Sequence, residues 1–167
     1  MEYPGYGVYE GISNEQQILE DALKSFDYIQ NKEGYLANQI IVFGRSLGSG
    51  PATFVAAERN PGALILMSPF ATIKGLILSY LGIFKGLASH FINESFNNEE
   101  MISKVKCPTL LLHGEMDNVI PIENSNKLIK KKGDISYNFS KTMTHNDFVF
   151  TSDIIYPIQN FLNILKN

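Results

Sequence analysis

The chain has 167 residues, of which 44% are hydrophobic and 19% are charged, as expected for a globular domain with a substantial core. Its 14 basic and 17 acidic side chains give a net charge of −3, which argues against a nucleic-acid-binding protein, because such proteins carry a basic face. The single cysteine, Cys107, excludes an internal disulfide and fits a reducing, cytoplasmic compartment. Three histidines and one cysteine form no zinc-type pattern, so no metal or cofactor is expected.

The first seven residues, MEYPGYG, predict a turn and lack the basic and apolar parts of a signal peptide. Ser13 and Gln16 match a capping box, and apolar residues at helical spacing from 18 to 29 predict a helix that ends near residues 31–34. Short apolar runs predict strands at residues 39–43, 63–67 and 109–112, with a weaker fourth strand at 135–139. Further helices are expected over residues 46–57, 121–131 and 154–165.

Strands that alternate with helices predict a single α/β domain over residues 1–167, with a parallel sheet covered by helices on both faces. Such folds bind ligands beyond the carboxyl ends of their strands. Residues 70–97 are expected to form a short lid-like helical insertion, or else an ordinary helix pair packed on the sheet. Its apolar centre, residues 76–84, is too short to span a membrane, which takes roughly 20 residues.

The strongest local signal is the segment Gly44-Arg45-Ser46-Leu47-Gly48, a G-x-S-x-G pattern between a predicted strand and a predicted helix. This context is typical of a cramped turn that exposes a nucleophilic serine, while the N–H of Leu47 at the helix start faces an oxyanion. The alternative is a glycine-rich helix start that only packs closely. A Walker loop is excluded because no Gly-Lys-Ser or Gly-Lys-Thr occurs, and Thr53 replaces the third glycine of a dinucleotide fingerprint.

A serine hydroxyl needs a neighbouring base to become a nucleophile. His145 lies in a polar loop after the last predicted strand, where catalytic residues commonly occur, so it is the preferred base. His113 closes a strand and is expected to be a partly buried structural histidine. His90 lies in the apolar region of residues 70–92.

Asp117 follows the third predicted strand by a few residues and is the preferred acid for orienting the base. Glu115 and Asp147 are the alternatives, and each fits better as a solvated loop carboxylate. The chain order Ser46, Asp117, His145 is that of the α/β-hydrolases, and it differs from the orders of the two well-known serine protease folds.

These motifs resemble the α/β-hydrolase superfamily, and within it the ABHD17-type serine hydrolases, which are protein depalmitoylases. The similar segments, spread from residue 2 to residue 148, are EYPGYG, IIVFGRSLGSGPA, ALILMSPFATIKG, ISKVKCPTLLLHGEMDNVIP and THNDF. The resemblance implies that Ser46 is the nucleophile, Asp117 the acid and His145 the base. Thr144 precedes His145 where the family usually has glycine.

The resemblance also implies further strands before the YPGYG turn, and an oxyanion loop that would give a second N–H donor. These precede the first residue of this chain, so it is expected to be the C-terminal part of the fold, either a fragment, an incomplete gene model or a degenerate copy. A fragment is favoured because the site residues are present. The strand at residues 39–43 is then an unpaired apolar edge, which favours aggregation.

The sequence therefore predicts a serine hydrolase that cleaves acyl esters or thioesters, with an acylated protein or a small acyl ester as substrate. The resemblance implies palmitoyl thioesters on membrane proteins, and Lys74 and Lys85 flank an apolar segment suited to an acyl pocket or to peripheral membrane contact. A peptidase or carboxylesterase of the same fold is the first alternative. A catalytically inactive hydrolase that acts as a binding protein is the second.

Overall fold

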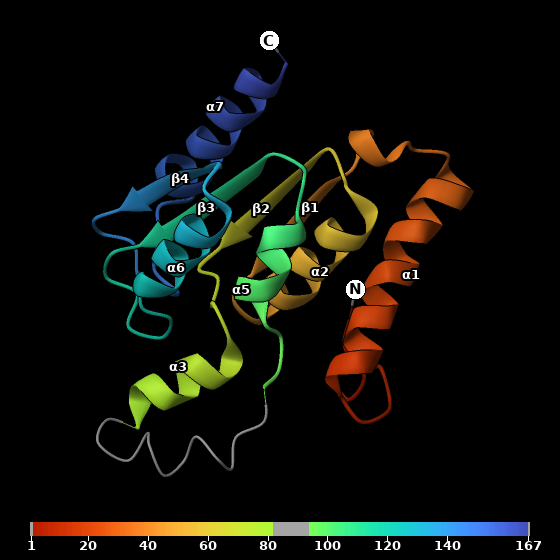
Figure 1. Ribbon diagram of the computed structural model, residues 1–167, viewed down its shortest axis with the longest axis horizontal. Coiled ribbons are helices and arrows are strands. Elements are labelled where there is room, and N and C mark those ends of the chain that lie inside the picture. The colour runs from red at the N-terminus through yellow and green to blue at the C-terminus, as the bar shows by residue number, and fades with distance from the viewer. Residues whose placement is uncertain (1, 82–93, 167) are drawn as a thin grey trace.

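The computed structural model describes residues 2–81 and 94–166, which are built around a parallel sheet with strand order β1-β2-β3-β4 (Figure 1). The strands are β1 (Ile41–Arg45), β2 (Ala63–Met67), β3 (Thr109–Gly114) and β4 (Ile135–Ser140). Since all neighbours pair in parallel, the carboxyl ends of all four strands lie along the same edge of the sheet. The predicted α/β fold is confirmed.

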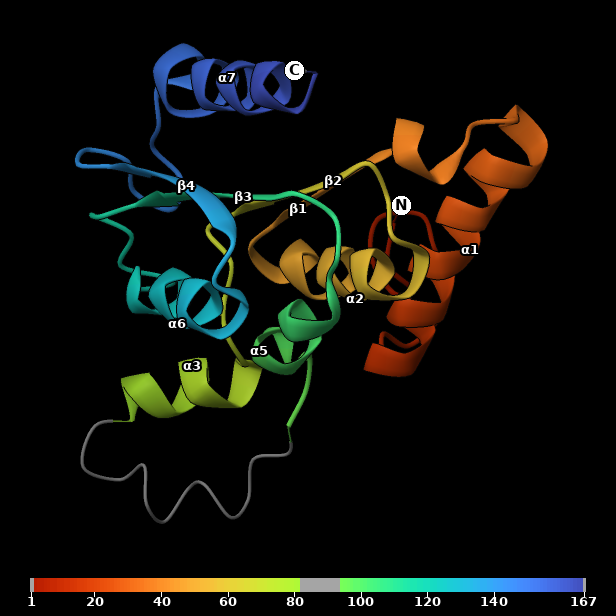
Figure 2. The ribbon, with the colours of Figure 1, turned by 45° about the horizontal axis from the view of Figure 1, so that its top comes forward.

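Helices cover both faces of this sheet, as the sequence predicts (Figure 2). One face carries α2 (Ser49–Arg59), α5 (Asn98–Met101) and α6 (Glu123–Lys132), and α7 (Tyr156–Leu165) lies on the other face. The long helix α1 (Glu15–Glu33) packs beside α2, and α3 (Ile73–Tyr80) lies beyond α5 and α6 (Figures 1 and 2). The described residues also form the short 3-10 helices η1 (Ala37–Gln39), η2 (Ser46–Gly48) and η4 (Ile102–Lys104) and the π-helix η5 (Phe150–Ile155).

Successive side chains of the two central strands alternate between two hydrophobic clusters, because a strand presents neighbours to opposite faces. Leu64, Leu66 and Leu111 belong to the cluster on the side of α2 and α6. Ile65 and Leu112 belong to the cluster under α7. Both central strands are buried along their whole length, so the core lies on both sides of β2 and β3.

Several predicted element boundaries differ from the structure by one to three residues, and two of these differences have a side-chain cause. The first helix is capped by Asn14, whose side chain accepts the Gln17 N–H, and not by Ser13. The first strand begins at Ile41 and not at residue 39, because the Gln39 side chain accepts the Leu36 N–H and closes the turn η1.

The outer strand β1 is covered on only one face. Its residues Val42 and Gly44 face α2, whereas Ile41 and Phe43 pair in register with Ala63 and Ile65 and so face the side of α7. Helix α7 does not reach this far, and Ile41 and Phe43 are 45% and 50% exposed. Within the part of the chain that the structure describes, β1 pairs only with β2.

The expected lid-like insertion at residues 70–97 is only partly described. Its first part forms α3, which has no fully buried residue and exposes Ile77 and Tyr80. Residues 82–93, which include His90 and Lys85, lie outside the described residues. Among residues 2–81 and 94–166, no helix is long and apolar enough to cross a bilayer.

We expect the isolated 167-residue chain to aggregate through β1, because an apolar strand with a free edge pairs readily with other strands. The substitution Phe43→Lys should slow aggregation, as measured by light scattering at matched concentration. Val8→Lys is the control, since it adds the same charge at a loop residue that is 93% exposed. Equal solubility of the two variants, or a monomeric wild-type chain with cooperative unfolding, would contradict this expectation.

Candidate active site

The carboxyl edge of the sheet gathers the predicted site residues. Ser46 follows β1 directly, Asp117 lies three residues past β3, and His145 lies in the loop after β4. Ser68 follows β2 and is fully buried. Each strand thus delivers one polar side chain to the same edge, as expected for an open parallel sheet.

Ser46 sits on a strained turn between β1 and α2. Its φ is 52°, a left-handed conformation that non-glycine residues rarely adopt and that clusters at functional sites. Gly44 makes the turn possible, because a Cβ there would lie 2.5 Å from both the Ala52 Cβ and the Gly48 carbonyl oxygen. Gly48 has no such constraint, since a Cβ there would meet only the Tyr3 hydroxyl at 3.8 Å. Of the two glycines in the pattern, only the first is sterically required.

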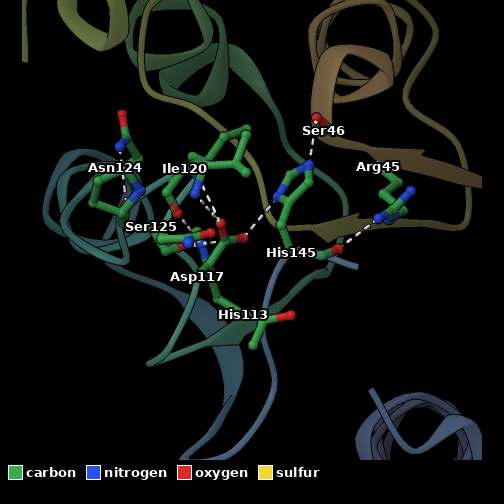
Figure 3. Close-up of polar contacts among 12 residues, drawn as sticks. Arg45, Ser46, His113, Asp117, Ile120, Asn124, Ser125 and His145 are labelled. Carbon is green, nitrogen blue, oxygen red and sulfur yellow. Dashed lines mark hydrogen bonds and ion pairs between the residues drawn. The ribbon is translucent and has the colours of Figure 1, made fainter. Parts of the chain in front are cut away.

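A chain of hydrogen bonds connects the three predicted residues (Figure 3). His145 Nδ1 lies 2.8 Å from Asp117 Oδ2, and His145 Nε2 lies 3.1 Å from Ser46 Oγ. A carboxylate can only accept, so Nδ1 carries the proton and Nε2 is free to accept from the serine hydroxyl. The expected convergence of Ser46, Asp117 and His145 is therefore found in the structure.

The Asp117 carboxylate is fully buried yet ionised. Burial alone would raise its pKa, but hydrogen bonds from the Ile120 N–H and from His145 outweigh burial and hold the pKa below its ordinary value. Its Oδ1 accepts the N–H groups of Val119 and Ile120 at 3.0 and 2.8 Å. The buried Ser68 hydroxyl also faces the carboxylate and helps to lower its pKa, although it makes no hydrogen bond of ordinary geometry to a described residue.

His113 is a structural residue, as the sequence predicts. It is fully buried, its Nε2 donates to the Ile120 carbonyl at 2.8 Å, and its Nδ1 accepts from the Ser125 hydroxyl at 2.6 Å. Burial lowers the pKa of its imidazole, so the ring is neutral and supports the loop that holds Asp117. Its burial is more complete than expected.

The loop that carries His145 is held by two local features. Met143 crosses directly over the end of β3, where a Cβ on Gly114 would lie 1.9 Å from the Met143 carbonyl oxygen. Thr144 and Asp147 then close a turn around His145: the Thr144 hydroxyl accepts the Asp147 N–H at 2.9 Å, and Thr144 N–H donates to the Asp147 carbonyl. Thr144 thus tightens this loop, and Asp147, an alternative acid in the sequence, is a loop-closing residue.

Sequence reasoning missed Arg45, the variable residue before the serine. Its guanidinium reaches the His145 carbonyl, at 2.5 Å from Nη2 (Figure 3). The same Nη2 lies 3.0 Å from the Asn146 side-chain oxygen. The only signal was its position within the G-x-S-x-G pattern, which by itself assigns no role to the variable residues.

Two further sequence expectations concern groups around the serine. Leu47 follows Ser46 in the turn η2, so its N–H lies at the start of a helical segment, where such groups have no partner within the helix. Glu115 is exposed, and its main-chain N–H donates to the Ser140 carbonyl.

No group of three or more metal-ligating side chains occurs in residues 2–81 and 94–166.

Comparison with known proteins finds relatives and one shared fold. No protein-family model matches the chain. It is 34% identical over 144 residues to the lysophosphatidylserine lipase ABHD12 of Macaca fascicularis, and 31% identical over 119 residues to the α/β-hydrolase domain-containing protein aho-3 of Caenorhabditis elegans. The matches cover 77% and 71% of this chain but only 36% and 34% of those proteins, so the chain spans about a third of their length.

Among solved structures, the acetyl xylan esterase from Paenibacillus sp. R4 superposes with a TM-score of 0.68 at 15% identity. The match covers 99% of this chain and 59% of the esterase. This likeness shows the fold. The ABHD17-type subgroup stays a prediction.

The two glycines of the serine turn should respond differently to alanine. Gly44→Ala should destabilise the fold by about 1–3 kcal/mol, because its methyl group collides with Ala52 and the Gly48 carbonyl oxygen. Gly48→Ala, with helical φ and ψ and open space, should be neutral or stabilising by about 0.5 kcal/mol. Denaturant unfolding checks both, and equal losses would contradict the steric account.

The stability of the protein should fall as pH drops below about 7, because the pKa of His113 is lower in the fold than its ordinary value of about 6.5. Between the two pKa values the unfolded chain binds the extra proton, so the free energy of unfolding decreases with falling pH. The slope from this group reaches at most about 1.4 kcal/mol per pH unit. His113→Gln should flatten the profile between pH 7 and 5 in urea titrations. Parallel profiles for the two proteins would refute the assignment.

Proposed function

Because the chain belongs to the α/β-hydrolase superfamily, we propose that it is the triad-bearing part of a serine hydrolase that cleaves acyl esters or thioesters. The observation that carries the proposal is the unbroken hydrogen-bond chain from Ser46 through His145 to the buried Asp117. The strained turn that presents the serine supports it, since such a turn is the hallmark of an exposed nucleophile.

In this reaction, Ser46 Oγ attacks the acyl carbonyl carbon while His145 Nε2 takes the hydroxyl proton. The C–O or C–S bond of the substrate then breaks, and the imidazolium gives its proton to the departing alcohol or thiol. A water molecule attacks the acyl-serine with His145 again as the base, which releases the carboxylic acid and restores Ser46. Asp117 holds the Nδ1–H tautomer and offsets the positive charge of the imidazolium.

The protein supplies two electrostatic aids to these steps. Asp117 remains ionised at neutral pH because its hydrogen bonds keep its pKa below the ordinary value, so its full charge faces the imidazolium. The Leu47 N–H, next to the nucleophile at the start of a helical segment, stabilises the oxyanion that forms on the carbonyl oxygen. A single oxyanion donor is worth roughly 100- to 1000-fold in rate.

The substrate we propose has a long apolar acyl chain. Helix α3 exposes Ile77 and Tyr80, and Leu81, which directly follows it, is exposed as well. The Tyr80 hydroxyl donates to the carbonyls of Asn118 and Val119, the two residues that follow Asp117. An exposed apolar helix therefore rests against the loop that carries the acid. The relative ABHD12 is named a lysophosphatidylserine lipase, and the sequence resembles protein depalmitoylases. A lysophospholipid and a palmitoylated protein each carry a fatty acyl chain, which supports the proposed class of substrate.

The substitution Ser46→Ala should abolish labelling by a fluorophosphonate probe, because the probe reacts only with an activated serine hydroxyl. Ser103→Ala is the matched control, since Ser103 is exposed and its hydroxyl donates to the Glu100 carbonyl. We expect labelling of the wild type and of the control, and none of Ser46→Ala, when labelled protein is resolved by gel and mass spectrometry.

A folded wild-type chain that stays unlabelled would reject the enzyme and support a binding protein of the same fold. Hydrolysis of matched acetyl and palmitoyl thioesters and of a long-chain lysophospholipid then tests the substrate. A preference for the acetyl compound would remove the long-chain proposal and leave a general esterase.

A further inference from the structure

Arg45 joins the strand of the nucleophile to the loop of the base. Its Nη2 donates to the His145 carbonyl oxygen at 2.5 Å and to the Asn146 side-chain oxygen at 3.0 Å. Its Cζ lies 5.9 Å from the centre of the Phe148 ring, within the range of a cation–π contact. One guanidinium thus contacts three of the four residues from 145 to 148, as Figure 3 shows for His145.

These contacts act on both ends of the reactive hydrogen bond. Arg45 directly precedes Ser46 in the chain, and the carbonyl that it binds belongs to His145 itself. Arg45 is therefore linked to Ser46 through the main chain and to His145 through a hydrogen bond. Both links act on the 3.1 Å distance between Ser46 Oγ and His145 Nε2. Between residues 41–48 and 141–149, the hydrogen bonds of Arg45 and the Ser46–His145 bond are the only ones in the described structure.

One buried atom of the half-buried Arg45 side chain argues that its position is not incidental. Arg45 Nε is buried and has no hydrogen-bond partner among residues 2–81 and 94–166, which is unfavourable for the fold. A side chain selected only for stability would satisfy or expose that donor. Here the donor is left unpaired while the far end of the side chain meets the His145 carbonyl and Asn146.

We propose that Arg45 is a positioning residue for the proposed serine hydrolase. It fixes the main chain at His145 so that Nε2 stays within reach of the Ser46 hydroxyl. The planar fork of arginine can bind two acceptors in fixed directions, whereas lysine offers only a flexible point charge. The proposal rests on the proposed function for its kinetic readout but not for its structural readout.

The test compares four variants with the wild-type chain. Arg45→Met keeps the apolar stem and removes the donors, Arg45→Lys keeps the charge, and Asn146→Ala removes only one acceptor. Arg59→Met is the matched control: Arg59 binds Asp27 through Nε and Nη2 at 2.7 and 2.9 Å, on the α1–α2 face and away from the site. Its loss removes two guanidinium hydrogen bonds, as Arg45→Met does, and should leave the serine reactive.

We expect Arg45→Met to slow fluorophosphonate labelling and kcat about 10- to 100-fold with KM unchanged, because a misplaced base loses rate without losing substrate affinity. Arg45→Lys should recover part of the rate, Asn146→Ala should lose less, and Arg59→Met should match the wild type. In NMR spectra, the deshielded His145 Nδ1–H signal of the bond to Asp117 should broaden or shift in Arg45→Met and persist in Arg59→Met.

Unchanged reactivity of Arg45→Met, or a loss no greater than that of Arg59→Met at equal folded fraction, would overturn the proposal. If the folded wild type does not label, the proposed function fails, and the His145 signal alone then decides on Arg45: an unchanged signal in Arg45→Met refutes the positioning role. If Arg45→Met does not fold, Arg45→Lys and Asn146→Ala carry the same comparison, and wild-type behaviour of both would refute it.

Discussion

A buried carboxylate that must stay ionised organises the carboxyl edge of this sheet. Asp117 is out of contact with water, and only donors fixed by the fold keep its pKa low. The main-chain N–H of Ile120 is one such donor, and the carbonyl of the same residue accepts from His113. His113 is in turn held by Ser125 on α6. The charge at the site therefore depends on a neutral histidine that takes no part in the proposed chemistry.

The second constraint is the distance between the two outer strands, because Ser46 follows one of them and His145 follows the other. β1 and β4 are three strand spacings apart, or about 14 Å at the usual separation of neighbouring strands. His145, which follows β4, reaches Ser46, which follows β1, only because the loop passes over the end of β3. Gly114 permits this crossing, since any Cβ there would overlap the Met143 carbonyl oxygen. A glycine at a strand end thus serves the site as much as the glycine before the serine.

The sequence was sufficient for the fold class, the strands and the convergence of Ser46, Asp117 and His145, because hydrophobic runs and strand-end positions carry that information directly. It misplaced the start of β1, where the Gln39 side chain closes a turn that periodicity does not reveal. It assigned no role to Arg45 or Gly114, because their contacts are with Met143, His145 and Asn146, far away in the chain. Contacts between distant loops leave no local pattern.

Ser46 follows an outer strand of the sheet, and this places unusual demands on the other contacts of that strand. With Ile41 and Phe43 exposed on the side of α7, β1 is held by β2 along one edge and by α2 on one face. The close approach of Gly44 to Ala52 fixes that face, and it can do so only while position 44 lacks a side chain. These contacts do not fix the position of the turn at Ser46 relative to the loop that follows β4. In the proposed role, Arg45 spans the gap between the two from the position next to Ser46, with an Nε that is buried and has no hydrogen-bond partner among residues 2–81 and 94–166.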